Sequence, residues 1–361
     1  MLHYFFKYDI LNVRKRLSDS RGEVSMVSLK EIALKCEVSV ATVSKSLNNH
    51  SDISNLTKKR VQKVAREMGY FPNSAARSLK TNRTYNIGVL LEDDARSGLT
   101  HEYFANILQY FKTGVESKGY DLTFINKNIG EYKDMSYYEH CLYRNFDGVV
   151  IACIEFEDPE VMELVNGKIP VVTIDYVFNN RSVILSNNAD GISQLVKHIH
   201  DMGHERIAYI HGVDSAVTRE RVGSFYRTIS ELDIDVPDEY IKVSPYLDSE
   251  GAAKVTKELM MLDNKPTCIM YPDDFAALGG IMAIRELGYK IPEDVSVAGY
   301  DGLSISRAIS PTLTTLVQDT KAIGEYAAKC LLREIENPNT SFPERISIQG
   351  HLQKGKTVKS M

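Results

Sequence analysis

The segment EVSVATVSKSLN, residues 37–48, predicts a short helix with two different faces. Val38, Val43 and Leu47 recur at helical spacing and form an apolar face that packs the helix against a neighbour. The opposite face carries small and polar side chains together with Lys45. Packing needs only the apolar face, so we interpret the outer face as a surface that contacts another molecule.

The residues around this segment, 27–71, predict helices only. Ser28 and Glu31 have the spacing of a capping box at the start of a helix over 28–36. A tight break follows at 36–38, Ser39 caps the second helix, and Ser54 precedes a third. Two helices joined by a tight turn are typical of a helix-turn-helix, whose second helix lies in the major groove of DNA.

This interpretation assigns DNA contacts to particular residues. Val40 and Ala41 suit thymine methyl groups, and Lys45 suits guanine O6 and N7. Hydroxyl-bearing side chains in such a motif bind phosphates. The set predicted for the helices is Ser28, Leu29, Ser39, Val40, Ala41, Ser44, Lys45, Asn48, Thr57 and Tyr70.

Charge is divided unevenly along the chain. Residues 27–83 hold 11 Lys and Arg against 4 Asp and Glu, a net charge of +7. Residues 1–26 carry +2 and residues 84–361 carry −14, which together give −5 for the chain. A small basic segment joined to a large acidic one indicates a polyanionic partner for the first part.

After residue 83 the pattern alternates between apolar strands and amphipathic helices. This predicts an α/β architecture with parallel sheets covered on both faces, and its length favours two lobes. No GxGxxG follows the first strand, so a dinucleotide site is not supported. Expected strands cover 86–91, 121–125, 148–153, 171–174, 206–210, 268–271 and 295–300, with a last one near 346–352; expected helices include 104–118, 191–202 and 276–287.

The spacing of the cysteines and the hydropathy of the chain indicate the cellular compartment that we expect. The five cysteines are scattered without CxxC spacing, which indicates reduced thiols and neither a disulfide framework nor a zinc site. No apolar run approaches the roughly 20 residues of a membrane-spanning helix. We therefore expect a cytoplasmic protein with no membrane partner.

Several stretches are similar to those of one family. VSLKEIALKCEVSVATVSKSLN (27–48), LVKHIHDMGHERIAYIHG (195–212), RERVGSFYRTI (219–229), MYPDDFAALGGIMAIRELGYKIPEDVSVAGYDG (270–302) and PTLTTL (311–316) resemble, in order, landmarks of the LacI/GalR family of bacterial repressors. The resemblance implies a helix-turn-helix headpiece over 27–71, a hinge helix and linker over 72–83, and a two-lobed core over 84–355 of the type I periplasmic-binding-protein class. Residues 1–26 match nothing in the family. We expect translation to start at Met26, so that this extension is not part of the native fold.

The resemblance also gives roles to the hinge. Residues 72–79 would form a helix when two protomers bind their operator, and Leu79 would enter the minor groove as a wedge that kinks the duplex. Asn73 would cap this helix, and Ala76 and Arg77 would lie beside the wedge. The alternative for this segment is a plain linker.

For the core, the resemblance implies an effector bound between the lobes, beyond the carboxyl ends of strands. Arg221, Asp273 and Asp301 match effector-contacting positions, although the family usually has Asn where Asp273 stands. Ser97, His101 and Tyr103 lie in the matching loop of the first lobe, and we assign His101 and Tyr103 to the site. An arginine with acidic partners favours a sugar over a purine; the alternative for each residue is a salt bridge.

These features together predict a ligand-responsive transcriptional regulator, most simply a repressor, that binds a near-palindromic operator as a homodimer without a cofactor. No heptad tail follows the last expected strand, so a zipper tetramer is not expected. A sugar-processing enzyme lacks support because no nucleophile–base pair or metal cluster emerges. A transport-type binding protein lacks a signal peptide and does not account for the headpiece. Glu37 departs from the small residue usual in the turn, where left-handed backbone costs about 1 kcal/mol.

Overall fold

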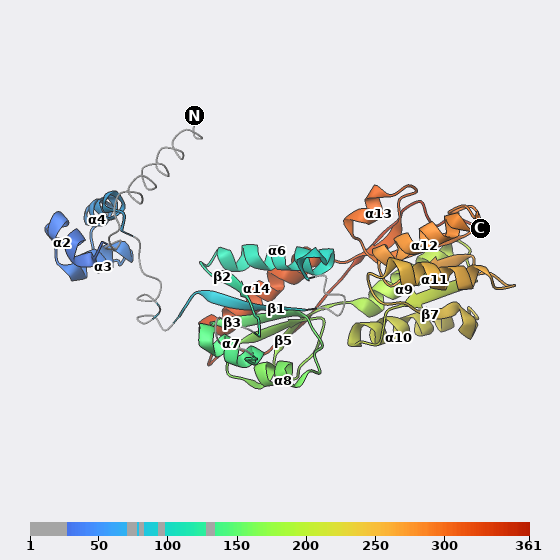
Figure 1. Ribbon diagram of the computed structural model, residues 1–361, viewed down its shortest axis with the longest axis horizontal. Helices are drawn as coiled ribbons and strands as arrows, with labels where there is room; N and C mark the ends of the chain where they lie inside the picture. Colours follow the sequence, from blue (N-terminus) through green and yellow to red (C-terminus); the bar gives the residue numbers. More distant parts are fainter. Residues whose placement is uncertain (1–26, 71–77, 79–82, 93–97, 128–133) are drawn as a thin grey trace, which may run out of the picture. The chain divides into compact units, whose positions relative to one another are not determined.

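The computed structural model describes residues 27–70, 78, 83–92, 98–127 and 134–361. The chain divides into two compact units, residues 1–82 and 83–361. Each unit is described by itself below, with the elements labelled in Figure 1.

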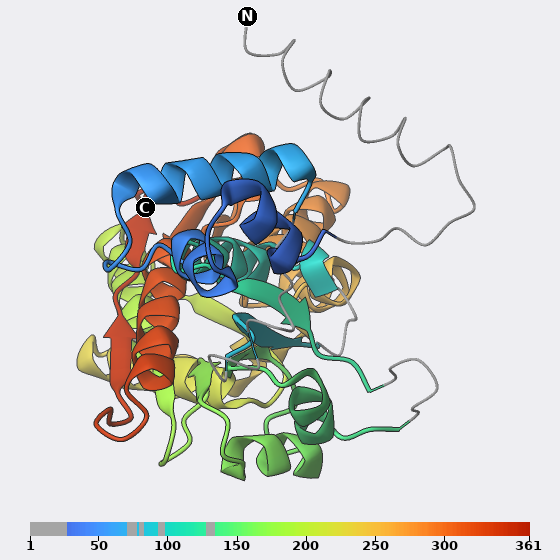
Figure 2. The same ribbon diagram turned by 90° about the vertical axis from the view of Figure 1, so that its left-hand side faces the viewer.

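The described part of the first unit contains three helices, α2 (Leu29–Cys36), α3 (Val40–Leu47) and α4 (Asn55–Met68) (Figure 2). Each starts at a serine whose side chain accepts a backbone N–H of the first turn: Ser28, Ser39 and Ser54. Their apolar faces meet in a small core of Ile32, Ala33, Cys36, Val43, Val61 and Ala65. The three predicted helices and their caps are therefore confirmed.

The second unit holds two six-stranded sheets. The first has the order β11-β5-β4-β3-β1-β2 and the second the order β12-β10-β9-β8-β6-β7. All the strand pairs are parallel apart from the antiparallel pair of β10 with β12. The strands are β1 (Asn86–Leu91), β2 (Asp121–Phe124), β3 (Gly148–Cys153), β4 (Val171–Ile174), β5 (Ser182–Ser186), β6 (Ile207–His211), β7 (Ile241–Val243), β8 (Cys268–Met270), β9 (Ser296–Asp301), β10 (Thr314–Val317), β11 (Arg345–Ile348) and β12 (His351–Gln353).

Helices cover both faces of each sheet. In the first lobe, α6 (Glu102–Glu116) and α14 (Thr320–Glu336) bury one apolar cluster, while α7 (Tyr137–Arg144) and α8 (Pro159–Asn166) bury another. In the second lobe, α11 (Ser249–Met260) and α12 (Asp274–Glu286) cover one face, and α9 (Asn188–Asp201) and α10 (Ala216–Glu231) cover the other. The short elements are α13 (Ser304–Ala308), η1 (Gly98–Thr100) and η2 (Asp238–Tyr240).

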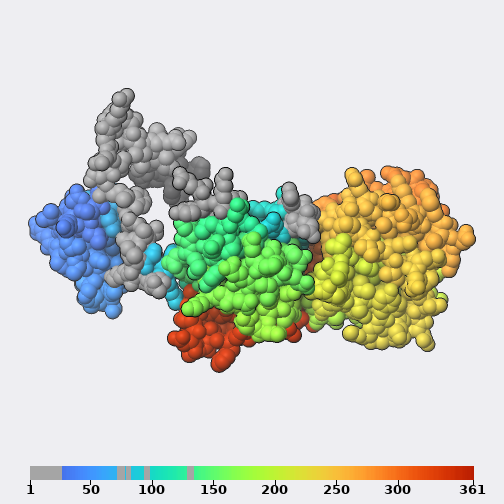
Figure 3. All heavy atoms as spheres, turned by 60° about the horizontal axis from the view of Figure 1, so that its bottom comes forward, coloured from blue at the N-terminus to red at the C-terminus, as the bar shows by residue number. Residues whose placement is uncertain are grey.

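The chain crosses between the lobes three times, after β5, after β10 and after β11. Consequently α14 and β11 belong to the first lobe although they lie late in the sequence, and Figure 3 shows this red segment together with the green first lobe. Sequence reasoning missed β5, β7 and β10 and took β11 and β12 for one strand. Within the described ranges, no helix is long and apolar enough to cross a membrane.

Candidate DNA-binding surface and effector site

The outer face of α3 carries most of the side chains that we assigned to DNA bases. Val40, Ala41, Lys45 and Asn48 are exposed, whereas Ser44 is half-buried. Asn48 donates from Nδ2 to the Ser44 carbonyl at 2.7 Å, and Lys45 donates from Nζ to Asp52. The free headpiece therefore holds Lys45 in an exposed ion pair that a DNA contact would have to replace.

The remaining headpiece residues have structural roles as well. Ser28 forms the predicted capping box with Glu31, and the Ser39 hydroxyl accepts the Thr42 N–H at 3.0 Å. Leu29 and Tyr70 are half-buried and pack against the headpiece core. Thr57 is half-buried in the first turn of α4, where its N–H donates to Ser54. Side chains with such roles fix the angle of α3 whether or not they also contact a phosphate.

The turn between α2 and α3 has the left-handed backbone that the sequence led us to expect. Glu37 has φ 51° and ψ 43°, a region that costs a non-glycine residue about 1 kcal/mol. The Val38 N–H donates to the Ala33 carbonyl at 3.1 Å, and Arg60 of α4 donates from Nη2 to the Cys36 carbonyl at 3.0 Å. These bonds hold the strained turn in place.

Several sequence predictions fall outside the described residues. They are the assignments for residues 1–26, for Ser97 and for the hinge residues Asn73, Ala76, Arg77 and Leu79.

In the core, Arg221 of α10 is 4% exposed and engages three groups. Its Nε donates to Asn188 Oδ1 at 2.8 Å, Nη1 donates to the Pro272 carbonyl at 3.0 Å, and Nη2 lies 3.6 Å from Asp301 Oδ1. Its guanidinium also lies over the Tyr300 ring, 3.8 Å from the centroid. The structure therefore shows Arg221 and Asp301 as a salt bridge, and their contact with an effector stays a prediction.

Asp301 ends β9 with φ 92°, a conformation that is strained for a residue with a side chain. Asp175, directly after β4, has φ 57°, and Leu247 has φ 58°. All three follow or end strands at the edge where α/β proteins bind ligands. Backbone strain that the fold maintains is common at functional sites.

The first lobe supplies Tyr103 from the first turn of α6. Its hydroxyl donates to Asp175 Oδ2 at 2.8 Å and lies 2.9 Å from Ser186 Oγ and 3.4 Å from Gln318 Oε1. Gln318 in turn donates from Nε2 to Asp301 Oδ1 at 2.7 Å. Burial raises the pKa of Asp175, so its proton is held more tightly than that of an exposed aspartate. A chain of polar contacts therefore runs from Tyr103 in one lobe to Arg221 in the other.

Asp273 is the N-cap of α12. One carboxylate oxygen accepts the N–H groups of Phe275 and Ala276, both at 2.9 Å, and the other accepts the Leu247 N–H at 2.8 Å. Burial, followed by the nearby charge of Asp301, raises the pKa of Asp273 to about 6. In this structure the carboxylate fixes the backbone around the site, because three of its four lone-pair positions accept backbone N–H groups.

Sequence reasoning missed four side chains of this region, Asp175, Ser186, Tyr246 and Gln318. The Tyr246 ring lies 5.7 Å from the Arg221 guanidinium, and its hydroxyl is 2.9 Å from Thr218 Oγ1. The position of Asp175 just after an expected strand was a usable signal. Of the residues that were assigned, His101 occupies the N-cap position of α6, and its ring packs edge-on against Phe104 with ring centroids 4.7 Å apart.

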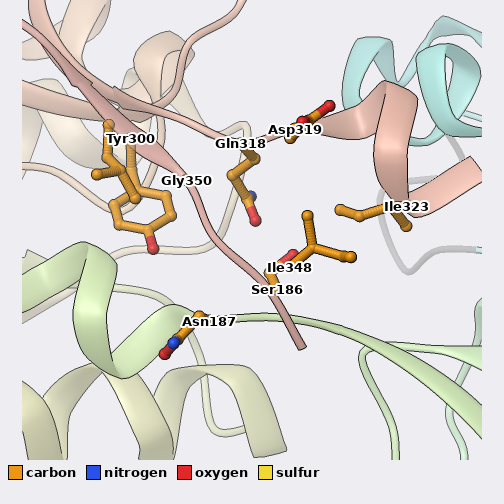
Figure 4. Close-up of a pocket in the computed structure, with 9 residues that line it drawn as sticks. Ser186, Asn187, Tyr300, Gln318, Asp319, Ile323, Ile348 and Gly350 are labelled. Atoms are coloured by element: carbon orange, nitrogen blue, oxygen red, sulfur yellow. The ribbon is translucent and has the colours of Figure 1, made fainter. Parts of the chain in front are cut away.

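A narrow gap, too small to admit a water molecule, lies where the three crossings between the lobes come together (Figure 4). Ser186 and Asn187 come from the first crossing, Gln318 and Asp319 from the second, and Ile348 and Gly350 from the third. The polar chain between Tyr103 and Arg221 therefore runs beside these three crossings, where a change of lobe angle would alter its distances.

Comparisons with known proteins agree with this geometry. Residues 28–73 match the model of the bacterial regulatory proteins of the lacI family, and residues 196–358 match the periplasmic binding protein-like domain. The chain is 30% identical over 341 residues to the HTH-type transcriptional repressor PurR of Mannheimia succiniciproducens, covering 93% of this chain and all of that relative. The chain belongs to the LacI/GalR family.

This family consists of DNA-binding transcriptional regulators with ligand-binding cores, and the resemblance noted from the sequence is confirmed. Another member, the ribose operon repressor of Haemophilus influenzae, is 28% identical over 320 residues, covering 88% of this chain and 94% of that one. The fold is also similar to that of the lac repressor dimer bound to operator and the anti-inducer ONPF. That comparison has a TM-score of 0.76 at 23% identity and covers 93% of this chain and 100% of that one. The predicted headpiece and two-lobed core are thereby confirmed as the fold class.

Proposed function

We propose that this protein is a transcriptional repressor that binds a near-palindromic operator as a homodimer and releases or tightens it when a sugar binds between the core lobes. The headpiece of residues 27–71 reads the half-site, residues 72–83 form the hinge, and residues 84–355 bind effector and partner subunit. It acts in the cytoplasm and has no catalytic activity. The DNA contacts are those assigned above to α3, its flanking residues and the hinge.

We infer a sugar effector from the hydrogen-bond donors and acceptors that lie together near the strand ends. Arg221 supplies fixed N–H donors, Asp301 and Asp175 supply acceptors, and Gln318 and Tyr103 supply both kinds. Adjacent sugar hydroxyls donate and accept within one small volume, which such a set matches. The name of one relative, the ribose operon repressor, agrees with a sugar effector.

The proposed switch couples two sites through lobe angle. An effector that binds one lobe arrangement better than the other shifts the population toward it, and the hinge segments of the two subunits follow. A coupling free energy of roughly 1–3 kcal/mol between the effector site and the operator site corresponds to a 5- to 150-fold change in operator affinity.

Thermal unfolding of the full chain with a panel of mono- and disaccharides tests the effector class. Purine bases are tested in parallel as the competing class of effector. A binding sugar at 100 times its Kd stabilises the core by about 2.7 kcal/mol. We expect a sugar to raise the core transition of the Arg219→Met control and to have no effect on Arg221→Met. Stabilisation by a purine base and by no sugar would contradict the proposed effector, while leaving the DNA-binding proposal intact.

The DNA-binding assignment has its own test in operator binding by two lysine variants. Lys45→Gln should weaken operator binding. Lys112→Gln changes a similarly exposed lysine on α6 of the core and should leave operator binding unchanged. Equal binding by both variants would remove Lys45 from the interface.

A further inference from the structure

A contact between the lobes lies outside the polar chain described above. Glu102 begins α6 in the first lobe, and Ser304 begins α13 in the second. Glu102 Oε1 accepts the Ser304 N–H at 2.8 Å, and Oε2 accepts the Ser304 hydroxyl at 2.9 Å. One carboxylate thus takes both donors of a single residue from the opposite lobe.

The segment that carries Ser304 is firmly attached to its own lobe. The Leu303 N–H donates to Asp274 Oδ2 at 2.6 Å, and Asp274 Oδ1 accepts the Thr315 hydroxyl at 2.6 Å. Asp274 is 1% exposed, and burial raises its pKa well above the usual range. The Ser306 hydroxyl donates to the Leu303 carbonyl at 2.7 Å, which closes the turn. These bonds fix the segment of Ser304 to the rest of the second lobe, so a contact between Ser304 and the first lobe restrains the second lobe as a whole.

The same segment reaches into the apolar core of the first lobe. Leu303 is 3% exposed and belongs to the buried cluster of Tyr103 and Ile107, while Phe275 and Ile305 pack against that cluster. Parting of the lobes would return these apolar side chains to water. The hydrogen bonds of Glu102 stand at the edge of this contact, where water competes with them.

We propose that Glu102 and Ser304 form a latch that holds the two lobes together as they lie in this structure, the arrangement that we call closed. The latch keeps Leu303 seated in the apolar core of the first lobe. Both parts of the latch adjoin the effector region, because Tyr103 follows Glu102 and Asp301 lies three residues before Ser304. The latch therefore sets how readily the lobes open before any effector binds. This inference depends on lobe closure and not on the identity of effector or operator.

The absence of tryptophan from the sequence allows a clean reporter. Phe275→Trp places a single tryptophan at the lobe contact, where its emission and its quenching by acrylamide report exposure. In this background Glu102→Ala removes both hydrogen bonds. We expect the ratio of open to closed molecules to rise about thirtyfold, since the two hydrogen bonds contribute about 1 kcal/mol each.

The expected signal is red-shifted emission and stronger quenching in Glu102→Ala. Ser304→Ala, which keeps its N–H, should give a smaller change in the same direction. The matched control is Glu116→Ala at the other end of α6, where Glu116 pairs with Lys112 of the same helix. Emission and quenching that are equal in Glu102→Ala and Glu116→Ala would overturn the latch.

If Phe275→Trp does not fold, amide hydrogen exchange in the chain without this substitution provides a second test of the latch. Loss of a local cap alone would speed exchange at Ser304 only. Opening of the lobes would also speed exchange at Leu303, whose N–H is bonded within the second lobe and covered by the first. Faster exchange at both amides in Glu102→Ala supports the latch, and an unchanged Leu303 refutes it.

Discussion

Replacement of Arg221 by methionine tests the energetic importance of the buried ion pair. Methionine keeps the length and apolar stem of arginine but removes the guanidinium, so the change in volume is small. Asp301, 8% exposed, then loses its cation, and Asn188 and the Pro272 carbonyl lose their donor. Removal of one partner from a buried pair costs about 3–5 kcal/mol, because the other charge remains buried.

The matched control lies two residues earlier on the same helix. Arg219 pairs with Asp214 at 2.9 Å, but the two side chains are 58% and 78% exposed. Arg219→Met should therefore cost less than about 1 kcal/mol. Urea unfolding of the full chain, followed by circular dichroism through the core transition, measures both variants under the same conditions.

A second variant separates charge from packing. Asp301→Asn combined with Arg221→Met removes the stranded carboxylate charge, so the double variant should be more stable than Arg221→Met alone. An unfolding free energy of Arg221→Met within about 1 kcal/mol of that of Arg219→Met, or a double variant no more stable than Arg221→Met, would show that the unpaired buried charge does not destabilise the core.

Three further outcomes follow from the headpiece and from Asp273. Glu37→Gly should raise the headpiece melting transition, since glycine relieves about 1 kcal/mol of left-handed strain; an unchanged or lower transition would show that the turn is not strained. Asp52→Asn releases Lys45 from its ion pair and should tighten operator binding severalfold in a fluorescence anisotropy titration, and weaker binding would contradict a role for Lys45 in DNA contact. Asp273, with its pKa raised from 3.8 to about 6, binds its proton more tightly folded than unfolded. The unfolding free energy should thus fall as pH rises across that window, and Asp273→Asn should flatten the fall in urea titrations at several pH values; an unaltered pH dependence would refute the assignment.

The sequence predicted the headpiece well because its signals are local. Serine caps, a capping box and helical spacing of Val43 and its neighbours all act within a few residues. The core strands that were found are continuous apolar runs, such as Gly148–Cys153. By contrast, Thr314–Val317 starts with two buried threonines, and Ile241–Val243 has three residues at a sheet edge. Such strands are defined by their partners, so a reading of local composition misses them.

In the effector region, the sequence predicted only those residues that lie in a recognisable family motif. Arg221 and Asp301 were found from their motifs, and the structure brings them together. Gln318 and Ser186 are ordinary polar residues in sequence and become notable only because two crossings between the lobes meet there. Asp273 shows the opposite case, because its motif indicated an effector contact whereas the structure displays three bonds to backbone N–H groups.

Selection from a pool of random duplexes by the purified full chain, with and without the sugar panel, tests the central claim most directly. We expect recovery of an inverted repeat with an easily kinked step at its centre, and we expect one of the sugars to abolish or enhance that recovery. Recovery should fall steeply as salt rises, because phosphate contacts release counterions. Failure to enrich any duplex under any of these conditions would contradict sequence-specific operator binding and leave the basic headpiece in need of another partner.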